Sequence, residues 1–141
     1  MGHPYTVIPK EQADTYLSQA NPVSGTEYTI LATTQNVEIN QIAVNVTWAV
    51  TQPTPLVIRV YVDGKTKVFT QANPVSTQNY IPLELPNLAD ANQTCKVTGG
   101  IYTDLIPLPL FKGRSVRVTM AVTWAVTQPT PLVGRVKYSK Y

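Results

Sequence analysis

Few side chains in this sequence could carry out catalytic chemistry. Its 141 residues include one histidine, His3, and one cysteine, Cys95. His3 stands at the N-terminus, where it is poorly placed to activate a nucleophile, and one histidine with one cysteine cannot form a transition-metal site. We therefore expect a protein that is not an enzyme and that holds no cofactor and no metal. Cys95 lies in a strand-like context, which predicts a small buried hydrophobic side chain, with intermolecular pairing as the alternative.

The eight carboxylates of the sequence show no recognisable catalytic spacing. Two chemical alternatives stay open. One is a glycosidase whose two carboxylates meet only in the folded chain. The other is a calcium site of oxygen ligands from Asp90, Asn92 and Asp104, although these residues match no calcium-binding motif.

Charge and hydropathy argue against two classes of partner. The 11 Lys and Arg residues are spread along the chain and give a net charge of only +3. A protein that binds nucleic acid usually carries a basic stripe or a known motif, so no specific nucleic-acid partner is expected. The apolar stretches are broken by Thr, Gln, Asn or Pro before they reach the ~18 residues of a membrane-spanning helix, so no membrane partner is expected.

Two internal repeats are the most informative feature of the sequence. Residues 46–60 read VTWAVTQPTPLVIRV and residues 122–136 read VTWAVTQPTPLVGRV, so the two copies differ only at Ile58 and Gly134. The segment QANPVS occurs at 19–24 and again at 71–76, and a tyrosine follows each copy at the same distance. The two repeats have different offsets, which places about 24 extra residues within 81–113 of the later half. We expect a pseudo-symmetric body in which each half supplies matching strands.

Strict alternation of apolar and polar residues predicts the long strands. Residues 42–50 and 116–126 place valines on one side and mostly threonine or alanine on the other, which is typical of a strand with one buried face. Val37 and Ile39 are out of phase with Ile42. A β-bulge near Asn40-Gln41 would bring both sets inward, so we predict a bulge there.

Prolines and turn residues mark the ends of the strands. Gln-Pro-Thr-Pro follows each long strand and predicts a stiff turn, with return strands from Leu56 to Val62 and from Leu132 to Tyr138. We interpret each long strand with its return strand as a β-hairpin. Asp63-Gly64 predicts a hairpin into Thr66–Thr70. Further strands are expected at Glu27–Thr33, Asn79–Leu85 (at a sheet edge, because of Pro82 and Pro86), Thr94–Thr98 and Ile101–Leu105.

This pattern of short strands predicts an all-β fold, an antiparallel β-sandwich or jelly-roll-like barrel of about eight strands with an N-terminal arm. We place the sandwich, with its two related halves, at residues 27–141. Residues 1–26 are expected to form the arm outside it. A short helix at Lys10–Gln19, preceded by Pro9, is predicted within the arm. A disordered tail is the alternative.

The repeated strands also contain the candidate core anchors and the candidate interaction surface. Trp48 and Trp124 are in phase with the inward valines, which favours core packing over sugar-stacking platforms. Their neighbours face outward and form either a partner surface or a solvated sheet face. Two arginines at matched positions of the return strands are either solvated charges or equivalent contacts to neighbouring subunits. The candidate interaction surface consists of Thr47, Thr51, Arg59, Thr123, Thr127 and Arg135.

With these elements in place, the chain resembles the small β-sandwich virion proteins of tailed bacteriophages, in particular head decoration proteins. The residues that carry the resemblance are the Val-Thr-Trp strand, the Pro-Thr-Pro-Leu turn, the strand to Val-Asp-Gly, and Phe111-Lys112-Gly113-Arg114-Ser115-Val116-Arg117-Val118. The resemblance covers residues 27–138 loosely. It implies a jelly-roll-like sandwich, trimeric or similar clustering, an N-terminal arm that reaches a neighbouring subunit, and no catalytic or ligand residues.

The sequence therefore predicts a non-enzymatic structural protein of a virus particle, located in the virion, that decorates or stabilises a viral shell. Its expected partners are further copies of itself, with a trimer favoured, and the major capsid protein or other virion subunits. The alternative is a glycan- or receptor-binding module of the phage-fibre or carbohydrate-binding type. That alternative needs an exposed aromatic platform, for which the candidates are Tyr61, Tyr102, Tyr138 and Tyr141.

Overall fold

A computed structural model describes residues 11–47, 55–72, 74–84, 112–124 and 131–141. These residues form nine strands: β1 (Glu11–Gln19), β2 (Tyr28–Thr33), β3 (Val37–Val46), β4 (Leu56–Val62), β5 (Lys65–Gln71), β6 (Tyr80–Glu84), β7 (Lys112–Gly113), β8 (Val116–Val122) and β9 (Leu132–Lys140). The strands predicted at Thr94–Thr98 and Ile101–Leu105 lie outside the described residues.

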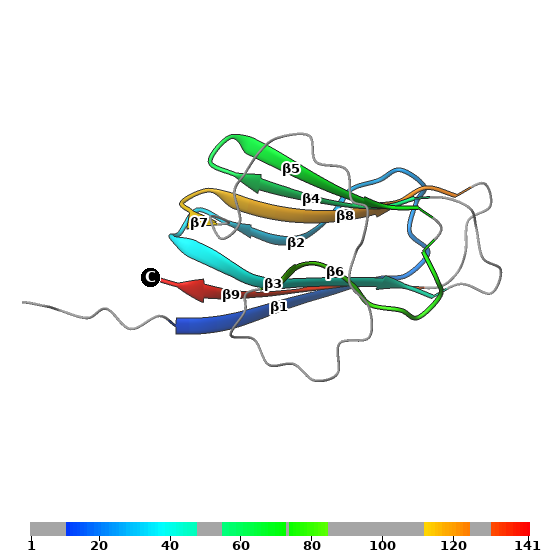
Figure 1. Cartoon of the computed structure of the whole chain (residues 1–141), viewed down its shortest axis with the longest axis horizontal. Helices are drawn as coiled ribbons and strands as arrows, with labels where there is room; N and C mark the ends of the chain where they lie inside the picture. Colours follow the sequence, from blue (N-terminus) through cyan, green and yellow to red (C-terminus); the bar gives the residue numbers. More distant parts are fainter. Residues whose placement is uncertain (1–10, 48–54, 73, 85–111, 125–130) are drawn as a thin grey trace, which may run out of the picture.

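The strands form two antiparallel sheets that face each other (Figure 1). One sheet has the order β1-β9-β3-β6, with β7 also paired to β3, and the other has the order β2-β8-β4-β5. The sheets are not closed into a barrel, so the sandwich of the two predicted alternatives is confirmed. β6 lies at an edge of the described sheet, as predicted for this segment from Pro82 and Pro86.

The core lies between the sheets and follows the predicted alternation. In β4 the inward residues Leu56, Ile58, Val60 and Val62 are buried, while the intervening residues are half-buried. β8 also points its alternate residues Val116, Val118, Met120 and Val122 inward. Trp124, just beyond β8, is 5% exposed and belongs to the same core cluster. Trp48 lies outside the described residues.

The β-bulge predicted in the long first strand is confirmed. The pairing of β3 with β9 shifts register between Ile39 and Gln41, so Asn40 is the inserted residue. Val37, Ile39 and Ile42 are all 0% exposed, although their spacing breaks period two. The bulge therefore lets one strand bury two out-of-phase sets of apolar residues on the same face.

The helix predicted at Lys10–Gln19 is wrong. Glu11–Gln19 is the strand β1, which pairs with β9 over its whole length and lies in a sheet of the sandwich. The side chains of Ala13, Thr15 and Leu17 alternate with more exposed neighbours. Pairing with β9 and this half-buried face outweigh the weak helix propensity of the segment. A domain boundary near residue 26 stays a prediction.

The interpretation of each repeat as a hairpin is also wrong, because its two strands lie in different sheets. β3 pairs with β9 and β4 pairs with β8, so each copy of VTWAVTQPTPLV crosses from one sheet to the other. The registers match between the copies: Val46 lies opposite Leu132, and Val122 lies opposite Leu56. Proline-rich connections stop a strand without determining whether its successor returns in the same sheet.

The paired registers divide the chain into two equivalent four-strand units. β1, β2, β3 and β4 of the first unit correspond to β5, β6, β8 and β9 of the second. The outer pairs obey the same relation, since Leu132 faces Gln19 in β9·β1 and Leu56 faces Gln71 in β4·β5. Asp63 and Gly64 join the units in a two-residue hairpin with φ values of 48° and 84°, as a type I′ turn requires.

All the repeated segments that the structure describes meet at one end of the sandwich, on the right in Figure 1. We call this the repeat end: the described parts of residues 19–28, 46–57, 71–80 and 122–133. Its hydrogen bonds come in matched pairs. Gly25 N donates to Val122 O and Thr77 N donates to Val46 O, both at 2.9 Å. The hydroxyls of Tyr28 and Tyr80 accept from the backbone N–H of Val23 and Val75, at 2.8 and 2.7 Å.

Candidate interaction surfaces

The structure separates the residues that the sequence grouped as one interaction surface. Thr47 and Thr123 lie at the repeat end, where their backbone N–H groups donate to Pro131 O and Pro55 O at 3.3 Å. Thr51 and Thr127 lie outside the described residues. Arg59 and Arg135 occupy equivalent places on the outer faces of opposite sheets, so the two arginines do not come together. That these residues contact a partner stays a prediction.

On its sheet, Arg59 belongs to a cluster of polar side chains around Glu27. Glu27 Oε1 accepts hydrogen bonds from Tyr61 OH at 2.6 Å and from Thr119 Oγ1 at 2.7 Å, and Arg59 Nη1 lies 3.8 Å away. The guanidinium of Arg117 stacks over the Tyr61 ring, 5.2 Å from its centroid. The cluster therefore holds one carboxylate and two guanidinium groups together on the outer face of β4 and β8, beside the start of β2.

The same contacts shift two pKa values in opposite directions. The hydrogen bond from Tyr61 lowers the pKa of Glu27 below its ordinary 4.5, outweighing the opposing effect of burial, and Thr119, Arg59 and Arg117 act in the same direction as Tyr61. Burial, together with the hydrogen bond to Glu27, raises the pKa of Tyr61 above its ordinary 10.0. The interactions within the cluster thus favour the state in which Glu27 is ionised and Tyr61 is neutral.

We expect Glu27→Gln to reduce the loss of stability at acid pH. Because the pKa of Glu27 is lower in the folded chain than in the unfolded chain, the carboxylate stabilises the fold above the unfolded value, and this is lost as pH falls through the folded pKa. The midpoint of urea unfolding of the wild type should therefore fall more steeply than that of Glu27→Gln between about pH 5 and pH 3. Glu11→Gln, which removes an exposed carboxylate, is the control and should keep the wild-type slope. Equal slopes for the wild type and Glu27→Gln would contradict this.

Arg135 forms the smaller counterpart of this cluster on the other sheet. Its Nε lies 3.7 Å from Asp14 Oδ1, and its guanidinium lies over the Tyr16 ring, 5.9 Å from the centroid. Tyr16 is 58% exposed and is the most exposed aromatic side chain in the described part of the chain. This surface therefore combines an aromatic ring with both signs of charge along β1.

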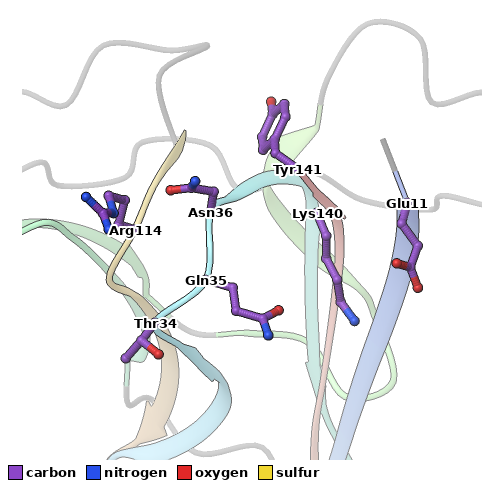
Figure 2. A pocket seen from close by; sticks show the side chains of 7 residues that line it. All are labelled: Glu11, Thr34, Gln35, Asn36, Arg114, Lys140 and Tyr141. Carbon is purple, nitrogen blue, oxygen red and sulfur yellow. The ribbon is translucent and has the colours of Figure 1, made fainter. Parts of the chain in front are cut away.

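A polar groove lies at the end of the sandwich opposite the repeat end. The β2–β3 turn, β1, the β7–β8 turn and the C-terminus line it through Glu11, Thr34, Gln35, Asn36, Arg114, Lys140 and Tyr141. Figure 2 shows Gln35 and Lys140 extending into the space between the turn and β1, with Arg114 on the other side of the turn. Lys112 Nζ lies 4.3 Å from the centroid of the Tyr141 ring, and Tyr141 OH donates to Glu38 Oε2 at 2.9 Å. The lining residues thus offer hydrogen-bonding groups, two cations (Arg114 and Lys140) and one carboxylate (Glu11).

Sequence reasoning missed most of this groove. It singled out Tyr141 only as one of several aromatic platforms, and it did not bring Arg114 or Lys140 together with this tyrosine. The two turns that form the groove are both polar, but nothing in their local pattern shows that they would meet. Asp63, in the β4–β5 turn, fixes the position of one of these two turns, since its Oδ1 accepts from the backbone N–H groups of Arg114 and Ser115 in the β7–β8 turn at 3.0 and 2.9 Å.

The polar, charged and aromatic groups on these surfaces can bind a partner. Within residues 11–47, 55–72, 74–84, 112–124 and 131–141, no group of three or more His, Cys, Asp or Glu side chains could hold a metal ion. The three residues of the proposed calcium site lie outside those ranges. The described part of the chain has no helix long and apolar enough to cross a membrane.

Comparison with known proteins gives one structural likeness. No family model and no curated protein matches the chain. Among solved structures, the chain is similar to a chain from "Cyanophage Pam1 capsid asymmetric unit", with a TM-score of 0.44 and 13% sequence identity, over 100% of this chain and 93% of that chain.

Proposed function

We propose that this protein is a non-enzymatic structural protein of a virus particle, which decorates and stabilises a viral shell through repeated shallow contacts. The observation that carries the proposal is the two-fold repetition of the repeat end. Val23 and Val75, which are equivalent in the two units, are 60% and 50% exposed. Two matched apolar side chains on one end of a rigid body suit attachment to a surface that itself presents repeated subunits.

Hydrogen bonds next to these two valines hold their backbone in a fixed position. The backbone N–H of each valine is held by a tyrosine hydroxyl, and the neighbouring turns donate to the last residues of β3 and β8. A partner that covers both valines would therefore meet a preorganised surface and would not have to order loose loops. Thr123, which is exposed at the same end, would lie at the rim of such a contact.

The resemblance to phage head decoration proteins agrees with this assignment. Such a protein needs a stable β body and a contact surface, and it needs no active site. The major capsid protein is the partner that we propose for the repeat end, and the virion is the proposed location.

The direct test is binding of the purified full-length chain to intact capsids of the virus that encodes it, measured by co-sedimentation. We expect the wild type to bind and the double variant Val23→Asp, Val75→Asp to bind at least about tenfold more weakly, since two charges would be desolvated in the contact. Ala32→Asp adds a charge at an exposed place on β2 and is the matched control, which should bind like the wild type. No binding by the wild type, or equal binding by all three proteins, would refute the proposal.

The second candidate, a glycan-binding module, is favoured by one observation, the polar groove with Tyr141 on its rim. A glycan array tests it separately. A hit that Tyr141→Ala and Gln35→Ala abolish, in a chain that does not bind capsids, would establish the second candidate and overturn the first.

A further inference from the structure

In the described part of the sandwich, the strands at the ends of the two sheets, β1, β6, β2 and β5, differ in how they are protected. An exposed edge offers unpaired N–H and C=O groups to any extended strand, and proteins block such edges with prolines, bulges or inward-pointing lysines. β6 contains Pro82, which has no N–H to donate. β2 has a register irregularity between Thr29 and Leu31. β5 has Lys67, which lies opposite the inward residue Val60 and is 8% exposed.

β1 carries none of these devices. Its sequence, EQADTYLSQ, has no proline and no lysine, and its nine residues pair with β9 without a register shift. The contrast is sharpest at equivalent positions of the two units, because Thr15 in β1 corresponds to Lys67 in β5. Among the strands that the structure describes, the first unit therefore leaves open an edge that the second unit blocks with an inward charge.

The sequence of β1 is complementary to itself in antiparallel pairing centred on Thr15. In that register Ala13 faces Leu17, and Thr15 faces its own copy, so the inward side pairs apolar with apolar and threonine with threonine. Leu17 already packs against the core, so the apolar contact would extend an existing one.

The outward side of the same register also matches. Asp14 faces Tyr16, and the carboxylate can accept a hydrogen bond from the phenol of the partner copy. Arg135 already lies beside both side chains and would neutralise the carboxylates near the two-fold axis. No like charges stand opposite each other, because Glu11 faces Gln19.

We propose that β1 is a self-association edge, which pairs antiparallel with β1 of a second copy of this chain and joins two sheets into one continuous sheet. The contact is isologous, with the two Thr15 residues on the two-fold axis, so it closes as a dimer and does not propagate. It covers Tyr16, the most exposed aromatic side chain among the described residues. Self-association through β1 does not depend on binding to a shell.

Site-specific cross-linking tests the pairing itself. In a Cys95→Ser background, Thr15→Cys should give an intermolecular disulfide under mild oxidation, since opposite residues of antiparallel strands have Cα atoms about 4.5–5.5 Å apart, within disulfide reach. Ser18→Cys is the matched control on the same strand. Its two copies would lie about 20 Å apart in this register, at about 3.4 Å per residue, and should not cross-link. Equal cross-linking at both positions, or cross-linking at neither, would overturn the proposal.

The mass in solution gives a second measurement on the uncross-linked chain. Multi-angle light scattering after size-exclusion chromatography should give a dimer for the wild type and for the charge control Ala72→Lys, and a monomer for Thr15→Lys. The lysine copies the residue that the second unit carries at the equivalent position, and circular dichroism verifies that the variant is folded. A folded Thr15→Lys that remains a dimer, or a wild type that is a monomer throughout, would contradict β1 pairing even if the protein binds capsids.

Discussion

Deletion of Asn40 is expected to abolish folding of the protein at room temperature. Asn40 is the extra residue of the bulge in β3, and its removal shifts every residue on its N-terminal side to the opposite face of the sheet. Val37 and Ile39, now 0% exposed, would then point outward, and Glu38 would point into the core. Each lost apolar burial costs about 1.5–3 kcal/mol, and an unpaired buried carboxylate costs more. The total approaches the whole stability of a typical domain, about 5–15 kcal/mol.

The variant Asn40→Ala separates the effect of the bulge on strand register from the effect of the Asn40 side chain. Asn40 Nδ2 donates to Ser139 Oγ at 2.8 Å and to Gln12 Oε1 at 3.1 Å, and the alanine variant loses both bonds while it keeps the bulge. Its expected cost is about 1–3 kcal/mol. Urea unfolding followed by circular dichroism should show a cooperative transition for Asn40→Ala and none for the deletion. A deletion variant that unfolds at the same midpoint as Asn40→Ala would show that the bulge does not determine the register.

This bulge could be predicted because its evidence is local. Two sets of apolar residues, each with strict period two, are out of phase with each other at one point in the sequence. Only an inserted residue can bury both sets on the same face of the strand. The strands β3, β4 and β8 were predicted for the same reason. In each of them, apolar side chains on every second position leave no helical stripe.

β1 was mistaken for a helix because its inward face is barely apolar. Ala13, Thr15 and Leu17 are too weakly apolar to show a clear alternation of hydrophobicity in the sequence. Their face can be recognised as the inward face of a strand only once β9 is known to pair with this segment. The repeat contained the missing evidence. QANPVS begins at the last residue of β1, Gln19, and at the last residue of β5, Gln71. Because a strand was predicted just before Gln71, extending the alignment backwards from Gln19 would have predicted a strand there too.

The strand partners and the groove could not be predicted from local pattern. Alternation shows which face of a strand is buried, and it does not show which strand lies next to it. The Pro-rich connection fits both a hairpin and a crossing between sheets, and the choice depends on which arrangement lets the two units complete each other's sheets. The groove depends on this choice in turn, because the β2–β3 turn and the β7–β8 turn meet only in the assembled sandwich.

The single difference between the copies of the long repeat leads to the second large effect. We expect Gly134→Ile, which would make the two copies identical, to destabilise the protein by about 3 kcal/mol, the upper part of the range for overpacked cores. A Cβ atom at Gly134 would lie 2.4 Å from Ile30 Cδ1 and 2.7 Å from Met120 Sδ. Both neighbours belong to the buried core and leave little space to move.

The asymmetry between the sheets explains why a glycine is tolerated there. Gly134 faces Val44 in one sheet, and the equivalent Ile58 faces Met120 in the other. Large side chains on the second sheet thus project into the space that small residues leave on the first. A core packed in this way cannot accommodate isoleucine at both position 58 and position 134.

A double-mutant cycle distinguishes overpacking from a general intolerance of strand residues at this position. Ile30→Ala alone should cost about 2–5 kcal/mol through the cavity that it leaves. The double variant Ile30→Ala, Gly134→Ile should lose much less stability than the sum of the two single variants, because the new isoleucine fills the cavity. We expect a coupling energy of about 0.5–3 kcal/mol. Val133→Ile, at the half-buried neighbouring position on the outer face, is the control and should couple weakly to Ile30→Ala. Additive effects of Gly134→Ile and Ile30→Ala would mean that Ile30 does not occupy the place of the missing side chain.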